Sequence, residues 1–533
     1  MNAKFKPLGL GAAVAAATAG YNGVANAQLE LAASSDLGNL ALIPYYTVRD
    51  GNVTGVHITN TSDATQVVKV RLRRGTDSMD ALDFNLILSP KDVWTGFLAA
   101  EGEDVVFNTT DNSCTAPATV NGKFTMPGIY RADADEGYIE IIGMGQPQDE
   151  TYPIAVSAKH GTDGVPASCT FVRDNFFANG VATSVRGVVD GETSVQRVPV
   201  GTEGATTLAL NEYDAPDNAL KVSYFVRDAS SGREFGNSAT HIANFLIDPS
   251  ITNQQFGLFS GDLLGFDYPD LNGGVGAGLD RDRFKELRDV LGGASVINDW
   301  SANADLNVGT DWVITFPGQY TMLDLPHYFA SLLTAGTDDA IPCNAGAPIP
   351  ANTFDSTGSV DSDDFSVAGA CDHRDIPAVA TFDVYDREEQ QRSQPDGELV
   401  VSPALPGQVV QTLLPFEVNV VQWGAEPVLG SENSDIVVAV PDSPFGWAEL
   451  NVTSSNSKVQ AVCEASANSA NFNIGEGLDA IVGAVVAYGC DSTDVNADEI
   501  PKIGFVAWER SFPANPDSNY GRIVEHSYGG VGS

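Results

Sequence analysis

Loops rich in carboxylates are the first candidates for chemistry in this chain of 533 residues. Calcium is a hard cation that prefers oxygen ligands, and acidic loops on a β-scaffold suit it. Three stretches qualify: Asp361, Asp363 and Asp364 with Asp372; Asp494, Asn496 and Asp498 with Glu499; and Asp267, Asp270, Asp280 and Asp282. The second begins like a D-x-N-x-D loop but lacks its glycine and its distant glutamate. We therefore expect Ca²⁺ as the one candidate cofactor, with a solvated acidic loop as the alternative at each place.

Other catalytic patterns are weak. The six histidines are dispersed and none lies in an H-E-x-x-H arrangement, which disfavours a zinc enzyme. No serine lies in G-x-S-x-G, although a serine triad of another type stays open. The glycine run at 273–278 lacks the P-loop lysine and is interpreted as a turn. We expect no enzymatic activity and name no catalytic residue; a glycosidase would need two carboxylates in a cleft.

A basic segment stands out, because the chain holds only 28 basic residues against 70 acidic ones. Its members are Lys69, Arg71, Arg73 and Arg74. In VVKVRLRRG the first three alternate with apolar residues, which predicts a strand with one apolar and one basic face, and Arg74 lies next to them. The basic face is either solvated or paired with nearby acids, or it serves assembly and anchoring. In that case it would contact the acidic surface of a neighbouring copy or the phosphates of lipopolysaccharide or another surface polysaccharide.

Export is predicted by residues 1–27, in which Lys4 and Lys6 precede an apolar stretch of small residues and Ala25-Asn26-Ala27 marks a cleavage site. The cysteines that follow are Cys114, Cys169, Cys343, Cys371, Cys463 and Cys490. An even number in an exported chain favours disulfides. The simplest arrangement pairs them in sequence order, although the connectivity stays open. A metal site is a weaker interpretation, since no pair has C-x-x-C spacing.

The charge excludes some partners. A formal net charge of −42 and a pI near 4.2 disfavour nucleic acid, which is bound through clustered Lys and Arg. No segment is long enough to predict a membrane-spanning helix. Apolar residues make up 43% of the chain, which is enough for a sizeable core.

Short strands must position these residues. NLALIPYYTV, VTGVHITN, VVKVRLRRG and DFNLILSP predict four strands, with Asp50-Gly51 as a hairpin turn and Trp94 as a core aromatic. A helix is expected near 280–291, followed by Gly292-Gly293. The fold class is mainly β: antiparallel β-sandwich modules of immunoglobulin or fibronectin type, with long loops and few short helices. We expect an N-terminal module at 28–200, a central β-rich region with inserted loops at 201–430 and a C-terminal module at 431–533.

Several segments carry a resemblance to a known family. IPYYTVRDGNVTGVHITNTSDATQVVKVRLRRG, GTDWVITFPGQY and the terminal FVAWERSFPANPDSNYGRIVEHSY resemble exported acidic proteins of marine gammaproteobacteria, a family that includes a surface-layer (S-layer) protein. The resemblance implies a secreted structural protein that assembles with itself into a two-dimensional lattice outside the outer membrane and contributes to the biofilm matrix. The alternatives are a secreted carbohydrate-binding or carbohydrate-degrading β-sandwich protein and an adhesin.

Overall fold

The computed structural model describes the greater part of two β-sandwiches. The described residues are 30–31, 37–76, 78, 80–126, 131, 133–178, 181–182, 187–189, 192–196, 212–228, 230–251, 269, 271, 283–293, 295–318, 322–323, 340–342, 348–350, 378–392, 411–424, 427–431, 436–438, 440, 443–453, 458–463, 490–495 and 500–529. The expected signal peptide and the glycine run at 273–278 lie outside these ranges.

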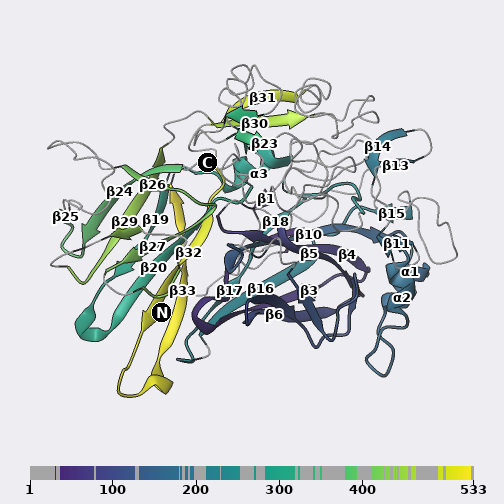
Figure 1. Cartoon of the computed structure of the whole chain (residues 1–533), viewed down its shortest axis with the longest axis horizontal. Helices are drawn as coiled ribbons and strands as arrows, with labels where there is room; N and C mark the ends of the chain where they lie inside the picture. Colours follow the sequence, from purple (N-terminus) through teal and green to yellow (C-terminus); the bar gives the residue numbers. More distant parts are fainter. Residues whose placement is uncertain are drawn as a thin grey trace, which may run out of the picture.

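The first sandwich consists of sheets A and B, at the lower right of Figure 1. Sheet A has the order β1 (Glu30–Leu31), β18 (Thr240–Ala243), β2 (Leu40–Thr47), β10 (Glu136–Pro147), β4 (Gln66–Arg74), β5 (Asp80–Leu88) and β8 (Cys114–Ala116), and β15 (Tyr213–Asp214) pairs with β10. Sheet B has the order β17 (Glu234–Ser238), β16 (Leu220–Asp228), β3 (Asn52–Asn60), β6 (Val93–Glu101), β7 (Asp104–Asn108) and β9 (Lys123–Thr125).

The second sandwich consists of sheets C and D, at the left of Figure 1. Sheet C has the order β25 (Gln391–Arg392), β24 (Ala378–Asp386), β29 (Phe445–Thr453), β19 (Ser295–Ser301) and β34 (Ser527–Gly529), and β26 (Gln411–Leu414) pairs with β24. Sheet D has the order β28 (Ile436–Val438), β27 (Val418–Trp423), β20 (Val308–Thr315), β32 (Ile503–Arg510) and β33 (Tyr520–Glu525). Its β27–β28 pair is parallel.

Smaller elements complete the described chain. The small sheets are β21 (Met322–Leu323) with β30 (Lys458–Cys463) and β31 (Cys490–Val495), β11 (Phe177–Ala178) with β12 (Val181–Ala182), β13 (Gly187–Val189) with β14 (Glu192–Gln196), and β22 (Ala340–Pro342) with β23 (Pro348–Pro350). The helices are α1 (Pro153–Ala158), α2 (Cys169–Arg173) and α3 (Arg283–Leu291). The described chain is mainly β, as the turn-rich sequence predicted.

Alternating apolar residues build the core of each sandwich. In the first, Trp94 is fully buried beside Phe84 and Phe107, at ring-centroid distances of 5.7 and 5.3 Å, so its expected place in the core is confirmed. In the second, Trp300 stacks on Trp423 at 5.5 Å, with the ring planes only 3° apart. Sheet pairs packed face to face in this way are held together mainly by the burial of apolar surface.

The central strands of sheet D, β20 and β27, are buried on both faces, so the two sandwiches share a core. Trp312 and Ile314 of β20 face sheet C, whereas Val313 between them belongs to the apolar cluster of the first sandwich. Phe505 of β32 packs against Tyr45 of sheet A with ring centroids 6.5 Å apart. A hydrogen bond of 2.6 Å from Thr315 Oγ1 of β20 to Pro44 O of β2 adds a polar contact between the two sheets. These contacts between sheet D and sheet A fix the position of one sandwich relative to the other.

Two expectations about organisation change, and a third is confirmed. Asp50 and Gly51 lie in a turn with left-handed φ values of 52° and 80°, but the turn joins β2 in sheet A to β3 in sheet B and closes no hairpin. The boundary at 200/201 divides no sheet, because β16 pairs with β3 and β18 pairs with β2. The strands of 201–430 are thus shared between both sandwiches. The helix expected near 280–291 is present as α3, with Leu287 and Leu291 buried.

Candidate functional site

The basic face of β4 is internal. Lys69, Arg71 and Arg73 have no exposed surface and Arg74 is only 7% exposed. Lys69, Arg71 and Arg73 alternate with the apolar residues of the strand, as the sequence predicted, but the face that they occupy is buried as well. A contact with a neighbouring copy or with polysaccharide phosphates through these four residues is therefore ruled out in the folded chain. The alternative of pairing with nearby acids is the one that the geometry supports.

The acids that accompany β4 come from the strands on either side of it. Lys69 Nζ and an Arg71 guanidinium nitrogen lie 3.7 and 3.9 Å from Asp83 Oδ2 on β5. On β10, Glu140 Oε2 accepts a hydrogen bond of 3.0 Å from the Arg73 guanidinium. Both ends of the Arg73–Glu140 pair are fully buried. Burying charge is costly unless it is paired, so these pairs are structural elements of sheet A.

One expected disulfide is confirmed and one gains backbone support. Cys114 of β8 and Cys169 of α2 form a disulfide. Cys463 of β30 and Cys490 of β31 stand opposite each other in the antiparallel register, and a bond between them stays a prediction. Cys343 and Cys371 lie outside the described residues.

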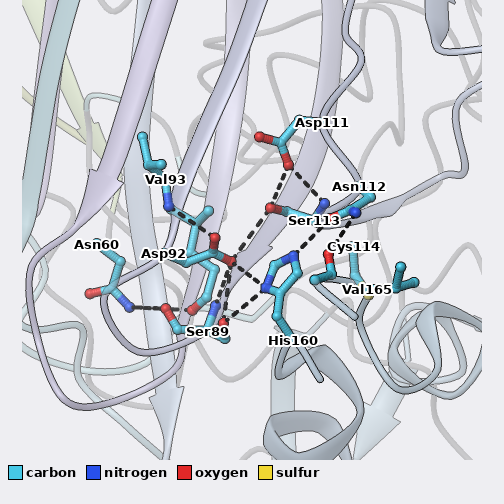
Figure 2. A network of polar contacts seen from close by, with 12 residues as sticks. Asn60, Ser89, Asp92, Val93, Asp111, Asn112, Ser113, Cys114, His160 and Val165 are labelled. Atoms are coloured by element: carbon cyan, nitrogen blue, oxygen red, sulfur yellow. Dashed lines mark hydrogen bonds and ion pairs between the residues drawn. The ribbon is translucent and has the colours of Figure 1, made fainter. Parts of the chain in front are cut away.

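A polar network surrounds the Cys114–Cys169 disulfide where the sheet loops meet the short helices (Figure 2). His160 follows α1 and points towards Asp92, which lies in the turn between β5 and β6. Its Nδ1 is 3.6 Å from Asp92 Oδ2 and 3.5 Å from Ser89 Oγ, and its Nε2 is 2.8 Å from Asn112 Oδ1. Ser113 Oγ donates to Asp111 at 2.7 Å.

The hydrogen bonds orient the His160 ring. Asn112 Nδ2 donates to Gly164 O at 2.8 Å, so Asn112 Oδ1 is the acceptor and His160 Nε2 the donor. On the other side of the ring, Ser89 Oγ donates to Asp92 Oδ2 at 3.3 Å, so Nδ1 lies beside the oxygens of both side chains.

This arrangement does not match a serine-protease triad. In a triad, one ring nitrogen faces the serine and the other is oriented by a carboxylate. Here Ser89 and Asp92 face the same nitrogen, and Asn112 occupies the other. Burial, opposed by the nearby His160, raises the pKa of the Asp92 carboxyl above its ordinary value. The network is best suited to holding the segment that contains α1 and α2 against the loops of the first sandwich.

A second polar site lies between the sandwiches. Asp311 of β20 is buried, and its Oδ2 accepts backbone hydrogen bonds from Val428 and Leu429, each 2.8 Å long. Burial raises the pKa of this carboxyl to about 7. Nearby, Arg233 after β16 bonds to both Asp228 and Glu509 of β32. Sequence inspection missed this site, because its members come from strands far apart in the chain and Asp311 stands alone in an apolar strand.

The calcium prediction falls almost entirely outside the described chain. Asp361, Asp363, Asp364, Asn496 and Asp498 are not described, and neither is the Asp267–Asp282 group. Asp494 lies in β31, opposite Val459 of β30. Within the described ranges, no three His, Cys, Asp or Glu side chains gather closely enough to hold a metal ion.

Comparisons with known proteins add no relative. No family model matches the chain, and no curated protein matches it. Among the helices that the structure describes, none is long and apolar enough to cross a membrane.

Proposed function

We propose that this protein is a secreted structural protein that assembles with itself into a surface layer outside the outer membrane and contributes to the biofilm matrix. The observation that supports this most is the shared core between the sandwiches. A lattice with long-range order requires subunits whose contact surfaces keep a fixed relative orientation, because small angular errors accumulate from copy to copy. Sheet D, whose central strands β20 and β27 are buried on both faces, supplies such rigidity.

The charge of the chain bears on the same proposal. Lys69, Arg71 and Arg73 are buried, so these cations offer no attraction to a neighbouring copy, and the net charge of the chain is −42. Copies this negative repel each other at low ionic strength, and screening or bridging cations reduces that repulsion. Assembly should therefore depend on ionic conditions, and Ca²⁺ bound at the predicted acidic loops would be one means of control.

The experiment is electron microscopy of the purified exported protein over a range of NaCl and CaCl₂ concentrations. We expect monomers at low salt and ordered sheets once salt or millimolar calcium is added. Monomers under every condition, at concentrations reached on a cell surface, would contradict the proposal. Thermal unfolding with and without a chelator tests the calcium part separately, since a bound ion raises the melting temperature by mass action.

A further inference from the structure

Two exposed apolar patches lie on the outer faces of different sandwiches. The first, the sheet B patch, consists of Val93 and Phe97 of β6 with Phe225 of β16 and His57 of β3. Val93 is 48% and Phe97 is 43% exposed. In the strand register, Phe97 stands opposite Gly55, which in turn stands opposite Phe225. A Cβ at Gly55 would overlap the Phe225 ring, so the missing side chain lets that ring lie flat on the sheet.

The second, the sheet C patch, consists of Trp447 of β29 and Tyr385 of β24. The two rings stack with centroids 4.5 Å apart and planes within 9°, and Trp447 is 38% exposed. Tyr385 stands opposite Trp447 on one side, and Asp299 of β19 stands opposite it on the other. Because Tyr385 covers one face of the indole and Asp299 is a small neighbour, the other face of the indole is the accessible one.

The charges around the two patches differ. Lys221 and Arg227 share the outer face of β16 with Phe225, and Glu234 stands opposite Arg227. Around Trp447 the outer face of sheet C carries Asp299, and one row further Asp383 opposite Glu449. Against these three acids, Arg387 lies over the Phe445 ring at the other end of the patch. A basic excess beside one aromatic patch and an acidic excess beside the other make the two faces complementary. In a chain this acidic, most other pairs of faces would repel.

We propose that the sheet B patch of one copy docks on the sheet C patch of the next copy. The inference rests on the proposed function and identifies one of its contacts. The two patches differ, so the contact is heterologous and can repeat from copy to copy, as a lattice or ring requires. Docking places Phe97 and Phe225 against the accessible face of Trp447 and brings Arg227, two residues along β16 from Phe225, towards Asp299. Exposed aromatic patches rimmed by polar residues are typical of such interfaces.

The test measures the critical concentration for assembly of the full exported protein by sedimentation and electron microscopy. Trp447→Ala should raise it about tenfold or more, as expected for a central aromatic anchor. Leu306→Ala is the matched control, because Leu306 is a comparably exposed apolar residue outside both patches and should leave the value unchanged. Equal melting temperatures for the variants and the parent exclude a folding defect.

A charge swap tests whether the two faces meet. Arg227→Glu and Asp299→Lys should each raise the critical concentration, and the double variant should recover part of the loss, since it restores opposite charges across the contact. Wild-type assembly with an unchanged critical concentration in Trp447→Ala would overturn the docking proposal alone. If Trp447→Ala instead abolishes binding of glucosamine oligosaccharides while assembly is unchanged, the patch binds glycan and docking is wrong. Wild-type protein that never assembles would overturn both proposals.

Discussion

Replacing Asp311 with Asn should remove a pH dependence of stability that originates between the sandwiches. Burial holds the pKa of Asp311 at about 7, against an ordinary value of 3.8. The folded state therefore binds this proton more tightly than the unfolded state does. The associated stability is fully present below about pH 4 and is lost as the pH rises through about 7.

The size of the effect follows from the shift. A rise from 3.8 to about 7 corresponds to about 4 kcal/mol, at roughly 1.4 kcal/mol per pKa unit. Asn keeps a carbonyl oxygen that can accept the hydrogen bonds from Val428 and Leu429, but it has no charge to bury. The stability of Asp311→Asn relative to the wild type should thus increase by about 4 kcal/mol between pH 4 and pH 8.

Urea unfolding of both proteins at several pH values measures the difference directly. Asp305→Asn is the matched control, because Asp305 is an exposed carboxylate in the turn before β20 and its replacement should not change the slope. If Asp311→Asn and the wild type show the same dependence on pH, the carboxyl is not buried as described and the shared core is in doubt.

Three further perturbations test the polar sites. Glu140→Gln removes the charge that accepts the hydrogen bond from the buried Arg73 and should lower the unfolding free energy by about 3 kcal/mol. Urea unfolding measures this loss, and a change below experimental error would contradict the burial of this pair. Serine at both Cys114 and Cys169 opens the loop between them and should lower the unfolding free energy by about 3–4 kcal/mol. The chain should also be cut faster by protease after α1. Unchanged stability and proteolysis would show that the bond is dispensable. His160→Ala removes the contacts to Asn112 and Asp92 and should lower the local stability by about 1 kcal/mol. Amide hydrogen exchange should become faster in 160–167 and stay unchanged in sheet C. Equal changes in exchange rate in both regions would argue against a local role.

The strands were predictable because their apolar residues alternate. Val68, Val70 and Leu72 indicated β4, and Trp94 was identified as a core residue from its place in a strand-like run. How the strands are distributed between sheets could not be predicted, since Asp50-Gly51 is compatible with both a hairpin and a turn between sheets. Which strands pair in each sheet depends on contacts between residues that are far apart in the sequence.

The functional interpretation of β4 failed for a related reason. A strand with Lys69, Arg71 and Arg73 on one face looks amphipathic and half-exposed when it is considered alone. The acids that neutralise it, Asp83 and Glu140, lie on two other strands, and only the sheet order brings them together. The stacking of Trp447 on Tyr385 could not be predicted either, because β24 and β29 are separated by a long stretch of chain and meet only in sheet C.

The central claim is that copies of this protein form an ordered layer at the cell surface. Electron microscopy of intact cells with and without the gene tests it most directly. We predict a regular layer on parent cells that is lost when the gene is deleted and returns on complementation. An intact ordered layer on cells that lack the gene would contradict the claim.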